Sequence, residues 1–242
     1  MKLKFVLHSL LLVGFWLGQD AYAQSSIPAM IEQIDKQRLP HGGFEAEIVI
    51  TPRINGVEQE PGRYSVKTNG TGQVLVEAKN PDQRGQKFLT TDSGVFFFAP
   101  RTKRAIRITP LQSLRGQASI GDISRLRFAA DYQAEKSSTT VESCKECVVF
   151  ELVSKNEAAT YAKIQLAARQ VAKLYEPVMA KLFLASGKLT KTVEFGTPEK
   201  GLPASTRYID AINTKLETKV AYLSIKQASF PTSMFNPRSL EQ

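Results

Sequence analysis

Apolar and polar residues alternate with a period of two over most of the chain. In the first such segment, Ala46, Ile48 and Ile50 alternate with Glu45 and Glu47. Because successive side chains of a β-strand point to opposite faces, this pattern predicts a strand with one apolar face. Similar short segments, separated by turn-forming residues, lie around residues 64–66, 74–76, 95–98, 106–108, 138–141, 148–152, 162–166, 178–184 and 216–222. We therefore predict about ten or eleven short antiparallel strands.

Two segments depart from this pattern. Near the N-terminus, apolar residues recur at helical spacing, which predicts a short amphipathic helix; they are Ile27, Met30, Ile31 and Ile34. Ser26 is in position to cap this helix, and Pro28 suits its first turn. Residues 111–130 hold apolar side chains among glycines and polar residues, too irregularly for a strand. We predict a loop with short helical turns that lies across the sheet.

These elements predict a mainly β (α+β) fold. A sheet with one apolar face must cover that face. One helix and one loop are too small to cover about ten strands that lie flat, so the sheet must curl with its apolar faces inside. A curled sheet of this size encloses either a packed core or a ligand cavity.

The N-terminus has the features of a cleavable secretory signal peptide. Lys2 and Lys4 precede an apolar run over 5–17, and Ala21-Tyr22-Ala23 provides a small-x-small cleavage pattern. The run is shorter than the ~20 residues that span a bilayer. We predict cleavage between Ala23 and Gln24, a single domain over 24–242, and a periplasmic location. Because no cysteine follows the apolar run, we expect no lipid attachment there.

The chain is basic, with a formal charge of +9 that falls to about +8 when the signal peptide is removed. In an exported protein this charge favours transient contact with anionic membranes or an acidic partner, or simply solubility. We expect no nucleic-acid partner. The densest basic cluster suits either a solvated hairpin tip or a docking patch; its members are Arg101, Lys103, Arg104 and Arg107.

Catalytic chemistry is poorly supplied. The two histidines are His8, within the signal peptide, and His41, in the turn after the predicted helix. A hydrolase would depend on that single base, and none of the common nucleotide-binding, hydrolase or zinc-protease motifs occurs. Glu45 and Glu47 share a strand face, which suits a solvated surface better than acid–base work. We predict no enzyme, no catalytic residue, no metal site and no cofactor.

The two cysteines, Cys144 and Cys147, form a CxxC pair between two predicted strands. An oxidising compartment permits a disulfide here. A thiol-disulfide active site would need the first cysteine at a helix N-terminus, whereas this position suits a hairpin turn. A structural disulfide or two free thiols is the simpler interpretation, and zinc would need further ligands.

Several segments together resemble a known family. They are 92–100, 104–111, 116–122, 128–132, 159–164 and, at the end of the chain, 230–235. In this order and spacing they resemble the outer-membrane lipoprotein-sorting-like family, the LolA-like carriers of the LolA–LolB superfamily. The resemblance covers nearly the whole mature chain. It implies a strongly curved, unclosed antiparallel half-barrel, with an N-terminal helix and a helical lid loop over an apolar cavity.

The resemblance also implies a function. It indicates a periplasmic carrier for a hydrophobic cargo (a lipid or lipoprotein acyl chains), with lipoproteins or an inner-membrane exporter of the resistance-nodulation-division type as candidate partners. The alternative is an RseB-like sensor that binds lipid or a membrane-protein partner. Where LolA carries an arginine that helps to lock its lid, this chain aligns Thr68, which favours a cargo other than lipoprotein.

Strand alternation and the family pattern together propose six cavity residues. Ile106 and Ile108 point to one strand face, Phe96 and Phe98 share a face of the preceding strand, and Leu111 and Leu114 begin the lid. The unbroken phenylalanine run over 96–98 leaves open which of its faces points inward.

Overall fold

The computed structural model describes residues 26–40, 42–137, 139–156 and 159–241. The predicted signal peptide and His41 lie outside these described residues. The predicted helix is present as α1 (Ile27–Arg38), with a proline in its first turn and Ile31 and Ile34 buried. Ser26 occupies the N-cap position but makes no side-chain capping hydrogen bond.

Most of the described chain forms one antiparallel sheet of 14 strands. Its order is β10-β11-β12-β13-β14-β15-β16-β1-β3-β4-β5-β6-β7, with β2 paired to β1. The strands are β1 (Phe44–Ile54), β2 (Val57–Glu58), β3 (Gly62–Thr68), β4 (Val74–Ala78), β5 (Lys87–Thr91), β6 (Gly94–Phe98), β7 (Ala105–Ile108), β10 (Tyr132–Lys136), β11 (Val148–Ser154), β12 (Lys163–Val171), β13 (Leu174–Phe183), β14 (Leu189–Phe195), β15 (Thr206–Asp210) and β16 (Leu216–Gln227).

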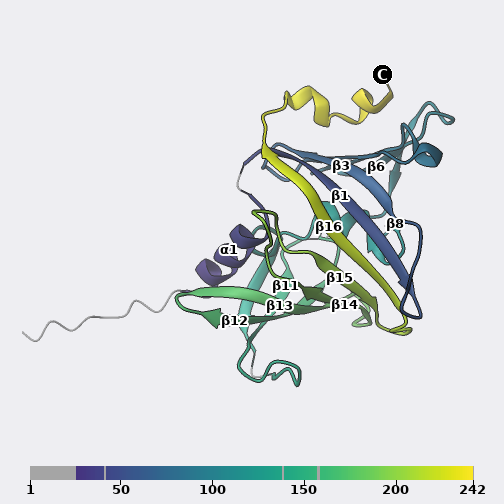
Figure 1. Ribbon diagram of the computed structural model, residues 1–242. Helices are drawn as coiled ribbons and strands as arrows, with labels where there is room; N and C mark the ends of the chain where they lie inside the picture. The colour runs from purple at the N-terminus through teal and green to yellow at the C-terminus, as the bar shows by residue number, and fades with distance from the viewer. Residues whose placement is uncertain (1–25, 41, 138, 157–158, 242) are drawn as a thin grey trace, which may run out of the picture.

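The sheet curls but does not close. Its edge strands, β10 and β7, are not paired with each other. The long β1 and β16 pair over their whole lengths at the centre, and register irregularities in β1, β12 and β13 accompany the bending. In Figure 1 these two strands run across the molecule, with α1 to one side. The unclosed half-barrel and its N-terminal helix are confirmed.

The segment 111–131, called the lid segment from here on, connects β7 to β10 along the open side of the sheet. It contains β8 (Ser113–Arg115), β9 (Ala118–Ser119), α2 (Ile120–Ser124) and α3 (Phe128–Asp131). A reciprocal capping box between Ser119 and Asp122 begins α2. The predicted loop with short helical turns is confirmed.

The main core fills the concave side of the sheet. Inward positions of the alternating strands are buried there, including Ile48, Ile50 and Tyr64. Helix α1 contributes Ile31 and Ile34, and the lid segment contributes Ile120 and Phe128. The core therefore contains residues from both halves of the sheet and from both covering elements.

A second, smaller core lies on the other side of β4–β6. Leu75 and Leu89 pack there against Phe235 and Leu240. The latter two belong to a C-terminal segment with two short 3-10 turns, η2 (Thr232–Phe235) and η3 (Pro237–Glu241), which contact β5–β7. Figure 1 shows this segment, in yellow, beside the end of the sheet that holds β3 and β6. A further 3-10 turn, η1 (Pro81–Gln83), connects β4 to β5.

Sequence patterning missed some strands and misplaced one. β2, β5, β14 and β15 were not predicted, so the sheet has more strands than the ten or eleven expected. The strand expected over 138–141 is not present in its described part, 139–141. The strand that precedes the cysteine turn is β10, which ends at Lys136. The connection that follows it folds as turns around an isolated bridge between Val141 and Cys144.

Candidate ligand-binding cavity

A cavity of about 700 Å³ lies between α1, the lid segment and the concave side of the sheet. Strands from both halves of the sheet contribute to its wall. The apolar part of the lining includes Phe44, Val66, Val74, Leu126, Phe195 and Val220. The volume falls within the range of cavities that hold small organic ligands.

Charged residues border the same cavity. Glu32 and Lys36 of α1 form an ion pair with half-exposed side chains. Arg127 pairs with Asp131, and Arg169 belongs to β12. The side chains of Glu32, Lys36, Arg127 and Arg169 are 40–60% exposed, so they mark where the cavity meets solvent. The cavity thus combines an apolar wall with a charged mouth.

Helix α1 is tied to the lid segment beside the cavity. Arg38 donates from Nη1 to the Leu126 carbonyl (2.8 Å) and to Asp35 Oδ1 (3.1 Å). The Ala129 amide donates to Asp35 Oδ2 (2.8 Å). One partly buried ion pair on α1 therefore binds the backbone of the lid segment through both of its members.

Aromatic rings hold the Arg38 guanidinium. Its Cζ lies 4.3 Å from the Phe128 ring centroid and 5.4 Å from that of Phe195, and these rings meet edge to face. Such cation–π contacts are strongest where water is excluded, and the Arg38 side chain is 14% exposed. Burial raises the pKa of the Asp35 carboxyl even though Arg38 and backbone amides act to lower it.

Two tyrosines of the sheet border the cavity near Arg38. Tyr208 of β15 is 3% exposed, and Tyr222 of β16 is partly buried. Burial raises the pKa of Tyr222 to about 12 and that of Tyr208 well above its ordinary value, while the Arg38 charge acts in the opposite direction on both. Both hydroxyls are therefore neutral and available as hydrogen-bond donors.

A second polar cluster anchors the lid segment to the C-terminal half of the sheet. Lys191 Nζ of β14 lies 2.5 Å from Asp122 Oδ2 of α2, and both residues are buried. Tyr161 donates its hydroxyl to Asp122 Oδ1 at 2.6 Å. The Ser119 amide also donates to Asp122 (2.8 Å), so this buried carboxylate has several partners.

The same short helix is anchored to the N-terminal half of the sheet. The hydroxyls of Ser124 and Thr90 of β5 are 2.7 Å apart. Arg125 donates to the Thr91 carbonyl. Helix α2 therefore bridges strands that lie on opposite halves of the half-barrel, and the two halves are held at a fixed separation beneath it.

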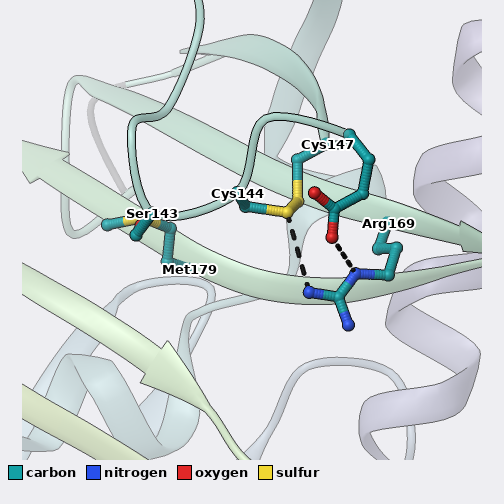
Figure 2. Close-up of a disulfide and its surroundings, with 6 residues drawn as sticks. Ser143, Cys144, Cys147, Arg169 and Met179 are labelled. Atoms are coloured by element: carbon teal, nitrogen blue, oxygen red, sulfur yellow. Dashed lines mark hydrogen bonds and ion pairs between the residues drawn. A yellow bond between two sulfur atoms is a disulfide. The ribbon is translucent and has the colours of Figure 1, made fainter.

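The structure joins Cys144 to Cys147 in a disulfide. Their turn lies between the neighbouring strands β10 and β11, and not at a helix N-terminus. Figure 2 shows that Arg169 reaches this turn: its Nε lies 2.9 Å from Glu146 and its Nη2 3.8 Å from the Cys144 sulfur. Since Arg169 also borders the cavity, the disulfide turn supports one side of the mouth.

The six residues predicted for the cavity lie elsewhere, and none of them borders it. Phe96 and Phe98 pack against the C-terminal segment in the second core, whereas Phe97 of the same strand packs against the main core. The inward face of this strand, which the sequence left open, is therefore the one that carries Phe97. Ile106 is half exposed in β7, and Ile108 is partly buried against the main core.

The remaining two predicted residues begin the lid segment. Leu111 is 40% exposed, and Leu114 is buried in the main core. Thr68, aligned with the lid-locking arginine of LolA, does border the cavity. Its hydroxyl donates to the Gln73 carbonyl (2.9 Å) within the β3–β4 turn. The arginine that contacts the lid backbone here is Arg38 of α1.

The basic cluster surrounds the β6–β7 turn, as expected for a hairpin tip. Arg101, Lys103 and Arg104 lie in the turn, Arg107 lies in β7, and all four are exposed. Within the described ranges, no group of acidic, histidine or cysteine side chains is arranged to hold a metal ion. No helix in that part of the chain is long and apolar enough to cross a membrane.

Sequence reasoning missed the residues that organise the site: Asp35, Arg38, Asp122, Lys191, Tyr208 and Tyr222. One signal was available for Lys191. In β14, inward positions alternate as Leu189, Lys191 and Val193, so a lysine occupies a core-facing position. A charge on the apolar face of a strand indicates a buried partner, although sequence alone does not identify it.

Several solved structures have a similar architecture. A LolA superfamily protein from Nitrosomonas europaea shares 26% identity, with 86% of this chain and 96% of that chain covered and a TM-score of 0.74. A domain described as an outer membrane lipoprotein-sorting protein, from Vibrio parahaemolyticus, gives 17% identity, coverage of 88% and 97%, and a TM-score of 0.67. A DUF1329 family protein from Desulfovibrio piger shares 18% identity, with 88% of this chain and 95% of that chain covered and a TM-score of 0.66.

The fold and its cavity define a protein of the LolA-like class. A family model described only as "uncharacterized protein" matches residues 70–242, and the chain belongs to that family. A comparison with curated proteins finds no significant match.

Proposed function

We propose that this protein is a periplasmic carrier that holds a hydrophobic cargo, a lipid or lipoprotein acyl chains, in the cavity beneath its lid segment. The observation that carries the proposal is the cavity of about 700 Å³ with an apolar wall from both halves of the sheet. The LolA-like fold supports it, because two of the similar structures are described as LolA superfamily and lipoprotein-sorting proteins.

The physical need for such a carrier is large. A sixteen-carbon acyl chain in water is disfavoured by about 12 kcal/mol, at ~0.8 kcal/mol per methylene. A chain that crosses an aqueous compartment therefore requires an apolar sheath. A half-barrel whose concave side is covered by a lid segment can provide one.

The cargo must be tested directly. Native mass spectrometry of protein purified from its own periplasm is expected to show a lipid adduct, and intact mass to show loss of residues 1–23. Ala204 borders the cavity from the β14–β15 connection, so Ala204→Trp should fill the cavity and remove the adduct. Ala185→Trp, at an exposed turn outside the cavity, is the matched control.

Two outcomes would contradict the carrier proposal. One is a wild-type protein that carries no lipid and binds no added amphiphile. The other is an Ala204→Trp variant that is folded and retains its lipid. A protein that keeps residues 1–23 and is recovered in the membrane fraction would contradict the soluble periplasmic form.

We further propose an inner-membrane exporter as a delivery partner. The chain is basic, and an exposed basic cluster surrounds the β6–β7 turn, remote in sequence from the cavity-lining residues of β13–β16. Cross-linking in intact cells through a photoreactive residue at Lys103 tests this contact. Capture of a membrane transporter would support it, and cross-links to lipid alone would contradict it.

A further inference from the structure

We propose that Arg38, Tyr208 and Tyr222 form an anion-binding subsite inside the cavity, and that the cargo is an amphiphile whose acidic headgroup lies there. This inference rests on the proposed carrier function and names the class of ligand: an apolar chain that ends in a carboxylate or phosphate. All three residues border the cavity.

The first observation concerns the unused side of the Arg38 guanidinium. Both hydrogen bonds that it donates within the described residues leave from Nη1, to Asp35 and to the Leu126 carbonyl. Nε and Nη2 have no partner in that part of the chain. These two atoms share one edge of the planar group, which is the geometry that binds a carboxylate or phosphate through two parallel hydrogen bonds.

The second observation concerns the two hydroxyls. Tyr208 is 97% buried (3% exposed), and neither it nor Tyr222 has a hydrogen-bond partner among the described residues. Unlike the unpaired hydroxyl of Tyr132, these two hydroxyls are not fully enclosed by protein atoms, so they are open to the cavity that both residues border. Two donors without protein partners that share a cavity with a free guanidinium edge fit a ligand with acceptor oxygens.

The third observation is that the guanidinium is held in place before any ligand binds. Phe128 and Phe195 pack against it, and Asp35 fixes its other edge. The Ala129 amide of the lid segment also donates a hydrogen bond to Asp35, so the Asp35 carboxylate does not interact with Arg38 alone. A pre-positioned fork loses little freedom when an anion binds, which favours affinity.

The test compares ligands that differ only in the headgroup. Laurate, dodecyl phosphate and dodecanol would each displace the neutral probe N-phenyl-1-naphthylamine from the full mature protein. We expect both anions to bind at least about tenfold more tightly than the alcohol, because hydrogen bonds to charged groups are the stronger ones. A preference for only one of the two anions would identify the source of the acidic headgroup.

Variants separate an anion site from a structural role for Arg38. Arg38→Met should abolish the preference while dodecanol affinity changes less than about threefold. Tyr208→Phe and Tyr222→Phe keep the Arg38 contacts and should each reduce the preference a few-fold. Arg53→Met, which removes an exposed arginine in an ion pair outside the cavity, is the matched control and should leave the preference intact.

Several results would overturn the subsite. They are equal affinity for alcohol and anions in the wild type, equal losses for both in Arg38→Met, or loss of the preference in Arg53→Met. If the wild type bound the alcohol but showed no preference, only the subsite would fail. If it bound none of the three ligands, the carrier function would fail as well.

Discussion

Lys191 Nζ lies 2.5 Å from Asp122 Oδ2 beneath the lid segment, and this buried pair joins α2 to β14. The two residues are 69 positions apart in sequence. Removing the cation would leave a buried carboxylate without its charge partner. The pair therefore fixes where the lid sits on the sheet.

We predict that Lys191→Met lowers the free energy of unfolding by about 3–5 kcal/mol, because it leaves a buried charge uncompensated. The double variant Asp122→Asn/Lys191→Met should recover part of this loss. Urea unfolding measures both. Arg53→Met breaks an exposed ion pair with Glu58 and should cost less than about 1 kcal/mol. Equal effects of Lys191→Met and Arg53→Met would refute the buried-anchor interpretation.

The raised pKa of Asp35 predicts a pH dependence of stability. Between the ordinary value of 3.8 and the higher pKa in the folded state, the folded protein binds more protons than the unfolded chain. Stability therefore falls as pH rises through this window. Asp35→Asn should remove this component of the fall, seen in urea unfolding at a series of pH values. A variant with the same slope as the wild type would show that burial of Asp35 is not its cause.

The disulfide is expected to be structural. Replacing Cys144 and Cys147 together by serine should lower the free energy of unfolding by roughly 2 kcal/mol, as expected for closing so short a loop. Ligand binding should persist, because neither cysteine borders the cavity. The counter-result is thiol-disulfide exchange activity in the wild type that disappears in the double variant. Arg169 links the disulfide turn to the cavity mouth, so the laurate affinity of Arg169→Gln tests whether the turn influences ligand binding.

The second core should contribute to stability without affecting the cavity. Phe235 is 2% exposed and packs on the side of the sheet away from the cavity. Phe235→Ala is expected to lower the free energy of unfolding by about 3–5 kcal/mol and to leave laurate affinity unchanged. Ser233→Ala in the same turn is the control, with a change within about 0.5 kcal/mol. A large loss of laurate affinity in folded Phe235→Ala would contradict this expectation, because it would show that the second core influences the cavity.

Strand prediction succeeded where one face is uniformly apolar and failed where polar side chains occupy inward positions. β1 was recognised because Ala46, Ile48 and Ile50 alternate with glutamates. β14 and β15 were missed because their inward positions include Lys191 and Tyr208, whose polar atoms serve the lid anchor and the cavity. Local conflict with the pattern thus coincided with a buried ion pair and a residue that borders the cavity.

The sequence by itself determined the period of the strands, the N-terminal helix, the irregular lid segment and a resemblance to LolA-like proteins. Each of these depends on neighbouring residues, through alternation, capping and turn chemistry. It did not determine which side of β6 faces inward, because Val95, Phe96, Phe97 and Phe98 are all apolar. That choice was made by the C-terminal segment, which covers Phe96 and Phe98. The cavity likewise depends on how far α1 and α2 stand from the sheet. Contacts between residues distant in sequence set that separation, among them Arg38 with Leu126 and Asp122 with Lys191.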